Sequence, residues 1–339
     1  MQAGPMNEVQ PASRPVSDTV NDDRVLPYAV APLDARGRLV RLGPALDDLL
    51  RNHAYPPEVA RAVGEAAALN VLLGSALTFE GRFQLQTRTD GIIDMLVVDF
   101  DSPDRIRAFA RFDAARLDAA RAAGEATPAA LLGRGHLAFT VDRGPSTQRY
   151  QGVVALDGQG LEAAAHQYFQ QSEQIPTLVR LAVGEVVNGA NEPSAWRAGG
   201  LIVQFLPDSP ERRRMADLDP GDAPEGAAKP EALEDDAWLE AKALAGSVED
   251  HELVDPALSS ERLLYRLFNQ RGVTVFEPQE IRHACRCSRD SIATMLKSFT
   301  PQERRDMVAD DGLISVTCEF CGVRRSFEPA EVEPEQSPE

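Results

Sequence analysis

The sequence predicts an α+β fold with an antiparallel sheet and helices in an N-terminal domain, followed by a helical acidic linker and a small cysteine-containing domain. Three features lead to this prediction. Strand-like runs follow one another with short turns between them, the composition becomes strongly acidic after residue 207, and all four cysteines lie between positions 285 and 321. Strands joined by short turns favour antiparallel pairing over the parallel sheets of α/β proteins.

The N-terminal domain is predicted to span residues 25–206, after a polar, flexible tail at residues 1–24. The sequence Pro56-Pro57-Glu58 opens a helix, because proline and an acidic residue are both favoured in a first helical turn. Apolar residues then recur at helical spacing at Val59, Val63, Ala66, Leu69, Leu73, Ala76 and Leu77. Strand-like runs follow at residues 83–87, 92–100, 137–141, 150–156 and 201–206.

Residues 207–272 are predicted to form an acidic, metastable helical linker. Between residues 208 and 255 the chain carries 15 Asp or Glu and only 5 Arg or Lys. Residues 208–230 fit a disordered acidic segment equally well. A weak amphipathic face is formed by Leu233, Ala237, Leu239, Leu244, Val248 and Leu253. A stronger helix follows with Leu263, Leu264, Leu267 and Phe268, and it ends at Gly272. The weaker helices are marginal alone and need a surface to dock on.

The four cysteines predict a small zinc-binding domain. Cys285-Arg-Cys287 is followed by 30 residues and then by Cys318-Glu-Phe-Cys321. Two close pairs of thiols match a tetrahedral Cys₄ site for one Zn²⁺ per chain, with a buried cluster of free thiols as the alternative. Four protein ligands leave no open position for a substrate, which argues against metallohydrolase chemistry. His283 is near enough in sequence to be a ligand, but the four cysteines already complete the site.

This domain is assigned to residues 273–329, with a second flexible tail at residues 330–339. Its nearby cations are interpreted as solvated surface arginines, with stabilisation of thiolate charge as the alternative. They are Arg286, Arg289, Arg324 and Arg325. From residue 277 to 330, 8 Arg or Lys stand against 9 Asp or Glu, so the domain lacks the basic footprint of a nucleic-acid reader.

The spacing of the first pair bears on oxidation. In an extended segment, Cys285 and Cys287 point to the same face with Cα atoms about 6.6–7 Å apart. This separation is at or beyond the upper limit for a disulfide, so oxidising the pair would buckle the backbone. A region of about 50 residues has little core of its own, and structural zinc contributes on the order of 10–16 kcal/mol in small peptides. Metal loss is therefore expected to unfold the domain. Zinc also holds the cysteines as thiolates, the form that attacks oxidants.

The composition of the whole chain narrows its partners and compartment. A net charge of −18 disfavours nucleic acid and anionic membranes as partners. The sequence has no apolar run of about 18 residues that would span a bilayer. The polar start does not resemble a secretory signal. A cytoplasmic protein with reduced thiols is therefore expected.

Several segments, in the right order, carry a resemblance to a known family. They are Phe79-Glu-Gly81, Tyr168-Phe-Gln-Gln-Ser172-Glu-Gln174-Ile-Pro176-Thr, Gly199-Gly200, Gln204-Phe-Leu-Pro207, Val275-Phe-Glu-Pro278, Cys285-Arg-Cys287-Ser-Arg289 and Val316-Thr-Cys318-Glu-Phe-Cys321. From about residue 25 to 329, the chain resembles the bacterial redox-regulated chaperones called heat shock protein 33. It departs from the family's usual pattern at His283, Gly322 and Arg325, where an aromatic residue, Asn and Tyr are common.

The resemblance implies a holdase chaperone that is inactive when reduced and zinc-bound. Oxidation would pair Cys285 with Cys287 and Cys318 with Cys321, zinc would leave, and the linker would unfold. The surface exposed would then bind unfolding or oxidatively damaged proteins during oxidative stress, with the chain as a homodimer. No ATP-binding GxxxxGK[ST] motif is present, in keeping with an ATP-independent holdase.

Two other functions compete with this prediction. A hydrolase built on His166, Ser172 and Glu173 is disfavoured because no GxSxG motif accompanies them, so the prediction is that the chain is not an enzyme. The polar run around Ser172 is interpreted as a set of structural contacts at a helix end, and His53 as a structural or surface histidine. The second alternative is a constitutive zinc-stabilised binding module without redox switching.

Overall fold

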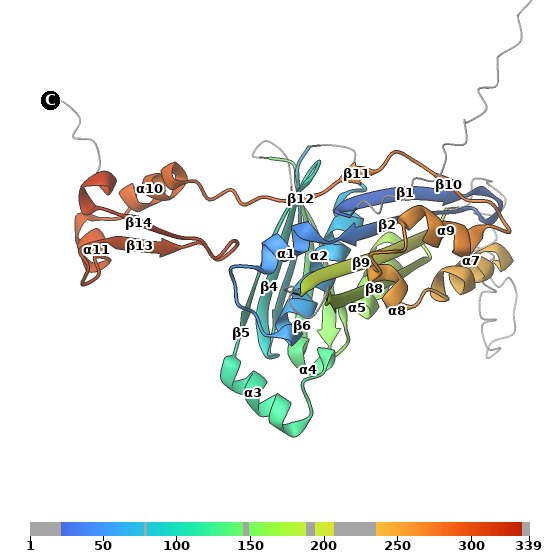
Figure 1. Cartoon of the computed structure of the whole chain (residues 1–339), viewed down its shortest axis with the longest axis horizontal. Coiled ribbons are helices and arrows are strands. Elements are labelled where there is room, and N and C mark those ends of the chain that lie inside the picture. The colour runs from blue at the N-terminus through green and yellow to red at the C-terminus, as the bar shows by residue number, and fades with distance from the viewer. Residues whose placement is uncertain (1–21, 78–79, 145–148, 188–193, 207–234, 334–339) are drawn as a thin grey trace, which may run out of the picture.

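The computed structural model describes residues 22–77, 80–144, 149–187, 194–206 and 235–333, and within these residues the strands form two large sheets with a helix between them (Figure 1). The first sheet has the order β10-β1-β2-β9-β8, with β11 also paired to β1. Its strands are β1 (Arg24–Val30), β2 (Ala35–Leu42), β8 (Thr177–Val186), β9 (Ala195–Phe205), β10 (Thr274–Val275) and β11 (Gln279–Glu280).

The second sheet has the order β12-β5-β4-β3-β6-β7. Its strands are β3 (Arg82–Thr89), β4 (Ile93–Asp101), β5 (Arg105–Phe112), β6 (Arg134–Asp142), β7 (Tyr150–Asp157) and β12 (Arg282–His283). All pairings in the two sheets are antiparallel except that of β12 with β5, which is parallel. The predicted α+β class with antiparallel sheets is therefore confirmed.

Helix α2 (Pro57–Gly74) lies between the two sheets and contacts strands of both. Nearly all of its side chains are buried, including the polar Asn70, because the helix has a sheet on either side. Helix α1 (Pro44–Leu50) precedes it, and the loop that joins them carries Asn52 and His53. The remaining helical segments of this part are η1 (Ala31–Leu33), α3 (Ala114–Ala123), α4 (Pro128–Leu132), α5 (Leu161–Tyr168) and the π-helical turn η2 (Phe169–Glu173).

The linker helices α7 (Asp236–Gly246), α8 (Asp250–Val254) and α9 (Ser260–Phe268) pack on the outer face of the first sheet (Figure 1). Their apolar residues form one buried cluster with the strands. Its linker members are Trp238, Ala241, Ala245, Val248, Leu253, Leu263, Leu264, Leu267 and Phe268. Leu239, which was expected on the apolar face of the linker, is instead 44% exposed.

Two arginines of the first sheet also hold the linker through its backbone. Arg41 donates to the carbonyls of Glu252 and Asp255 at 2.7 and 2.8 Å. Arg197 donates from Nε to the carbonyl of Val254 at 2.8 Å. These carbonyls lie at the C-terminal end of α8, where they have no partner within the helix and favour a cation.

After α9 the chain follows the edges of both sheets through β10, β11 and β12, and then enters the C-terminal domain (Figure 1). Its elements are α10 (Arg289–Lys297), α11 (Pro301–Asp306), β13 (Ile314–Thr317), β14 (Arg324–Phe327) and η3 (Pro329–Val332). Its fully buried apolar side chains form a small cluster of Ile292, Leu296, Ile314, Phe327 and Val332. Such a core is small for a domain of about 50 residues to fold alone.

Several predictions fall wholly or partly outside the described residues. These are the flexible tails, the acidic segment at residues 208–230, Leu233 and Phe79. Within the predicted N-terminal tail, Asp22 pairs with Arg197, and the Asp23 carboxylate accepts from the backbone N–H groups of Gly43 and Ala45 at 2.8 and 2.9 Å. Ordered structure thus begins before Val25. None of the described helices has the length and apolar character that a bilayer crossing requires.

Replacing Trp238 with Ala should loosen the linker from the sheet. The Trp238 side chain is 4% exposed and its ring lies 6.1 Å from that of Phe205. Loss of so large a buried side chain costs several kcal/mol, so amide exchange in α7 is expected to accelerate at least about tenfold. Hydrogen–deuterium exchange with mass spectrometry measures this. The neighbouring Leu239→Ala should leave exchange unchanged, and equal behaviour of the two variants would contradict the packing.

Glu65 should make stability depend on pH. Burial raises its pKa from the ordinary 4.5 to about 7, with Glu162 on α5 and Asp250 on α8 adding to the shift. Because the folded state binds the proton more tightly than the unfolded chain, ionisation of Glu65 destabilises the fold progressively between about pH 4.5 and 7. Glu65→Gln is therefore expected to be more stable than the parent above pH 7, by roughly 1–2 kcal/mol after solvent screening.

Thermal denaturation at pH 5 and pH 8 checks this expectation, with a clearly larger gain at the higher pH. Glu58→Gln on the same helix is the matched control. Hydrogen bonding to Arg121 lowers the pKa of Glu58, so this variant should lose stability at the higher pH. A gain of equal size for Glu65→Gln at both pH values would contradict the assignment.

Candidate metal centre

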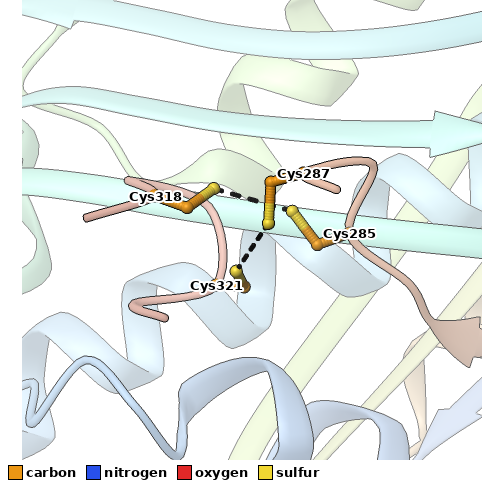
Figure 2. A group of neighbouring side chains, drawn as sticks. All are labelled: Cys285, Cys287, Cys318 and Cys321. Atoms are coloured by element: carbon orange, nitrogen blue, oxygen red, sulfur yellow. Dashed lines mark hydrogen bonds between the residues drawn. The ribbon is translucent and has the colours of Figure 1, made fainter. Parts of the chain in front are cut away.

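The four cysteine sulfurs converge on one point between two loops (Figure 2). Cys285 and Cys287 lie in the segment between β12 and α10, and Cys318 and Cys321 lie in the turn that joins β13 to β14. All four Sγ atoms are within 4.8 Å of one another. The Cys285–Cys318 pair is 3.7 Å apart and the Cys287–Cys321 pair 3.3 Å apart. None of the four is in a disulfide.

Local structure holds the second loop in place. The β13–β14 hairpin ends at the pair Thr317 and Arg324, and beyond it the N–H of Cys318 donates to the carbonyl of Val323 at 3.1 Å. The N–H of Gly322 donates to the carbonyl of Cys318 at 2.8 Å. Gly322 has φ +66°, a left-handed conformation that Gly adopts freely and Asn tolerates best among other residues.

The first loop is fixed at both ends. The N–H of Ala284 donates to the carbonyl of Ile106 at 3.0 Å, which places Cys285 directly after the strand added to the second sheet. Ser288 caps the N-terminus of α10 through a reciprocal pair of hydrogen bonds with Ser291, so the helix begins just after Cys287. Arg325 donates to the carbonyl of Cys287 at 3.1 Å and thereby links the two loops.

The four sulfurs fit a tetrahedral metal ion. A Zn–S bond of about 2.3 Å implies S–S distances of about 3.8 Å in a regular tetrahedron, close to the separations in this cluster. Burial raises the pKa of the Cys321 thiol. Since burial disfavours the thiolate at this position, a cation is needed to hold the sulfur in its charged form, and a coordinated metal supplies that cation.

The two loops also contact the N-terminal domain through the α1–α2 loop. Asn52 donates from Nδ2 to the carbonyl of Cys321 at 3.0 Å, and His53 donates from Nε2 to the carbonyl of Phe320 at 3.2 Å. A Cβ on Gly322 would lie 2.6 Å from the carbonyl oxygen of Asn52. The absence of a side chain at Gly322 thus permits this close approach.

The second sheet supplies further contacts. The Phe320 ring meets the ring of Phe109 edge to face at 4.9 Å, and the Arg107 guanidinium lies 4.0 Å from its centre. Burial is the largest single influence on the pKa of Arg107 and lowers it, but the hydrogen bond to Asp99 and the negative charges of Asp99, Cys285 and Asp101 together raise this pKa above its ordinary value. A permanent positive charge therefore lies beside the sulfur cluster.

The structure separates the predicted site residues into two groups. It brings the four cysteines together, whereas the cluster found among the described residues does not include His283. Burial lowers the pKa of His283, whose Nε2 has no hydrogen-bond partner within the described part of the chain. His53, interpreted from sequence as structural, stacks on Tyr55 at 4.7 Å and contacts the second cysteine loop. Its sequence position carries no signal for that contact.

The residues considered for a hydrolase make structural contacts. His166 accepts a hydrogen bond at Nε2 from the N–H of Val179 at 2.8 Å. Glu173 accepts from the hydroxyl of Tyr168 at 2.8 Å. Ser172 lies in the exposed π-helical turn η2. Each of the two bonded side chains is thus engaged with a structural partner and not with a nucleophilic serine.

Comparisons with known proteins identify the family of this chain. A family model described as Hsp33 protein matches residues 23–328. The chain belongs to the Hsp33 family. A 33 kDa chaperonin of Caulobacter vibrioides is 41% identical over 312 residues, covering 91% of this chain and 96% of the relative. The 33 kDa chaperonin of Vibrio cholerae is 32% identical over 305 residues, covering 90% of this chain and 92% of the relative.

A solved Hsp33 structure shows the same fold. The crystal structure of the 33 kDa chaperonin from Thermotoga maritima superposes with a TM-score of 0.69 and covers 91% of this chain and 96% of its own. The two sequences are 20% identical. The sequence resemblance to heat shock protein 33 is thus confirmed for this chain.

The metal centre can be tested with Co²⁺ as a spectroscopic probe. Reduced protein is expected to bind one Co²⁺ per chain with the strong visible bands of tetrahedral thiolate ligation, because four sulfurs surround one position. Cys318→Ser should weaken binding by more than about tenfold. His283→Gln is the control and should keep both the spectrum and the stoichiometry. A changed spectrum in this control would show that the histidine is a ligand.

Proposed function

We propose that this Hsp33-family chain is a redox-regulated, ATP-independent holdase chaperone whose Cys285, Cys287, Cys318 and Cys321 bind one Zn²⁺ in the reduced state. The convergence of the four sulfurs within 4.8 Å is the observation that carries the proposal. When bound, zinc would keep the sulfurs as thiolates and cross-link the two loops. The relatives from Caulobacter vibrioides and Vibrio cholerae are named 33 kDa chaperonins, which supports chaperone function.

Oxidation is the proposed trigger. Two thiolates would lose two electrons to form one disulfide, and hydrogen peroxide would take up these electrons, together with two protons from solvent, to become two water molecules. The proposed pairs are Cys285 with Cys287 and Cys318 with Cys321. In the structure the short Sγ distances run between the loops, at 3.7 and 3.3 Å. Pairing within each loop would therefore require the loops to rearrange, which agrees with a switch that opens the domain.

The linker is the proposed responding element. Its helices bury an apolar face of the first sheet that includes Leu26, Tyr28, Leu39, Leu201 and Val203. If unfolding of the C-terminal domain releases the linker, this face and the apolar residues of the helices become available to unfolding proteins. Apolar surface of this kind binds exposed hydrophobic segments without sequence specificity.

The proposed partners are unfolded or oxidatively damaged proteins, and the proposed active form is a homodimer. The chain would act in the cytoplasm, where reduced thiols are the resting state and oxidation is a signal. Nucleic acid and membrane are not proposed as partners, in keeping with the net charge of −18.

A redox titration of the full-length chain tests the function. Reduced, zinc-loaded protein is treated with peroxide at mild heat, and zinc release, free thiols and aggregation of a thermally unfolding client are followed. We expect loss of four thiols and one zinc per chain, together with suppression of aggregation that the reduced protein lacks. Mass spectrometry of tryptic peptides then identifies the cysteine pairs.

The controls separate the proposal from its alternatives. A variant with all four cysteines replaced by Ser should show no response to peroxide. Zinc loss without any gain in holdase activity would favour a constitutive zinc-stabilised module. Equal suppression of aggregation by the reduced and oxidised forms would contradict redox regulation.

A further inference from the structure

The N-terminal domain contacts the residue that lies between the first two cysteines. The guanidinium of Arg286 pairs with the carboxylate of Asp101 at the end of β4. Asp101 is 3% exposed, whereas Arg286 is partly exposed. The partner on the sheet is thus a buried carboxylate, and the cysteine loop supplies the partly exposed cation that pairs with it.

The second sheet also contacts the second cysteine loop, again through a residue that lies between the two cysteines of the loop. Phe320 lies between Cys318 and Cys321, and its ring packs on Phe109 and under the guanidinium of Arg107. An aromatic ring in such a position gains from edge-to-face packing and from the cation above it. A residue from inside each cysteine loop is therefore held by the outer face of β4 and β5.

The two contacts share one network of buried charges. Arg107 donates to Asp99 at 2.9 and 2.5 Å, and Asp99 is 1% exposed. Arg82 bridges the two carboxylates, since its Nε lies 3.2 Å from Asp101 and its Nη1 lies 3.7 Å from Asp99. Because β3, β4 and β5 pair in register, the groups that receive Arg286 and Phe320 belong to one rigid surface.

We propose that this surface, together with Asn52 of the α1–α2 loop, holds the two cysteine loops in the arrangement that binds the metal. The four residues Asn52, Asp101, Arg107 and Phe109 are named the loop socket. The N-terminal domain then sets how readily zinc leaves, although it supplies no ligand. By thermodynamic linkage, the free energy by which the loop socket favours metal binding equals the free energy by which the bound metal favours contact of the loops with the socket. Loss of zinc therefore releases the outer face of β4 and β5 directly, in addition to the route through the linker. This inference rests on the proposed function only in taking zinc as the metal.

The test measures zinc transfer from the reduced, full-length, zinc-loaded chain to an excess of a chromophoric chelator. Asp101→Asn keeps an acceptor for Arg82 but removes the charge that holds Arg286. We expect zinc to leave about three to ten times faster, as for loss of a partly exposed, charge-assisted hydrogen bond. Arg286→Gln should act to the same extent, and the double variant should be no faster than either single one.

Asp104→Asn is the matched control. Asp104 pairs with Arg282 at 2.7 Å on the same edge of the sheet, but this pair lies outside the two cysteine loops. Its zinc transfer should match that of the parent chain. Circular dichroism melting of each variant checks that the N-terminal domain is intact, and Arg286→Gln, which alters only a partly exposed side chain, serves if Asp101→Asn fails to fold.

The outcomes distinguish the socket from the proposed function. Parent-like rates in Arg286→Gln and Asp101→Asn would overturn the socket, as would additive effects in the double variant. Faster zinc transfer in these variants, with no holdase activity after peroxide treatment of the parent chain, would support the socket and overturn only the proposed function. A reduced parent chain that holds no zinc would overturn both.

Discussion

The convergence of four sulfurs is the constraint on which the C-terminal domain depends. Five fully buried apolar side chains form the core of that domain, whereas two loops separated by 30 residues meet with their sulfurs within 4.8 Å. Packing on this scale contributes too little to offset the entropy of ordering the loops. In the proposed function, a metal bound by four thiolates would supply a cross-link of the required strength and would couple the state of the sulfurs to the fold of the domain.

The linker helices likewise depend on a contact outside themselves, which is their packing on the first sheet. The linker helices bury their apolar residues on the first sheet, and Arg41 and Arg197 bind the carbonyls at the end of α8. Helices of five to eleven residues would not persist alone in water. The linker therefore relies on contacts outside itself, as the proposed release on oxidation requires.

Sequence patterns identified the elements whose signal is local. The helix opened by Pro57 and the strands around residues 83–87, 92–100, 137–141, 150–156 and 201–206 were predicted and are present as α2, β3, β4, β6, β7 and β9. Strands β1, β2, β5 and β8 were not predicted, although the arginines of β5 alternate with apolar residues in the period of a strand, a signal that could have found it. The two-residue strands β10, β11 and β12 have no sequence signature, because they exist only through pairing with the edges of the sheets.

The amino-acid sequence by itself determined the donor chemistry, since it places four thiols in two close pairs, the donor set that suits a tetrahedral metal ion. It also identified the family, since a family model described as Hsp33 protein matches residues 23–328. Only the tertiary structure decided what surrounds the sulfurs. Arg286 has the sequence character of a solvated surface cation, yet its partner Asp101 lies 185 residues away. Such contacts depend on how β4, β5 and the α1–α2 loop are placed in space, and no local pattern encodes that placement.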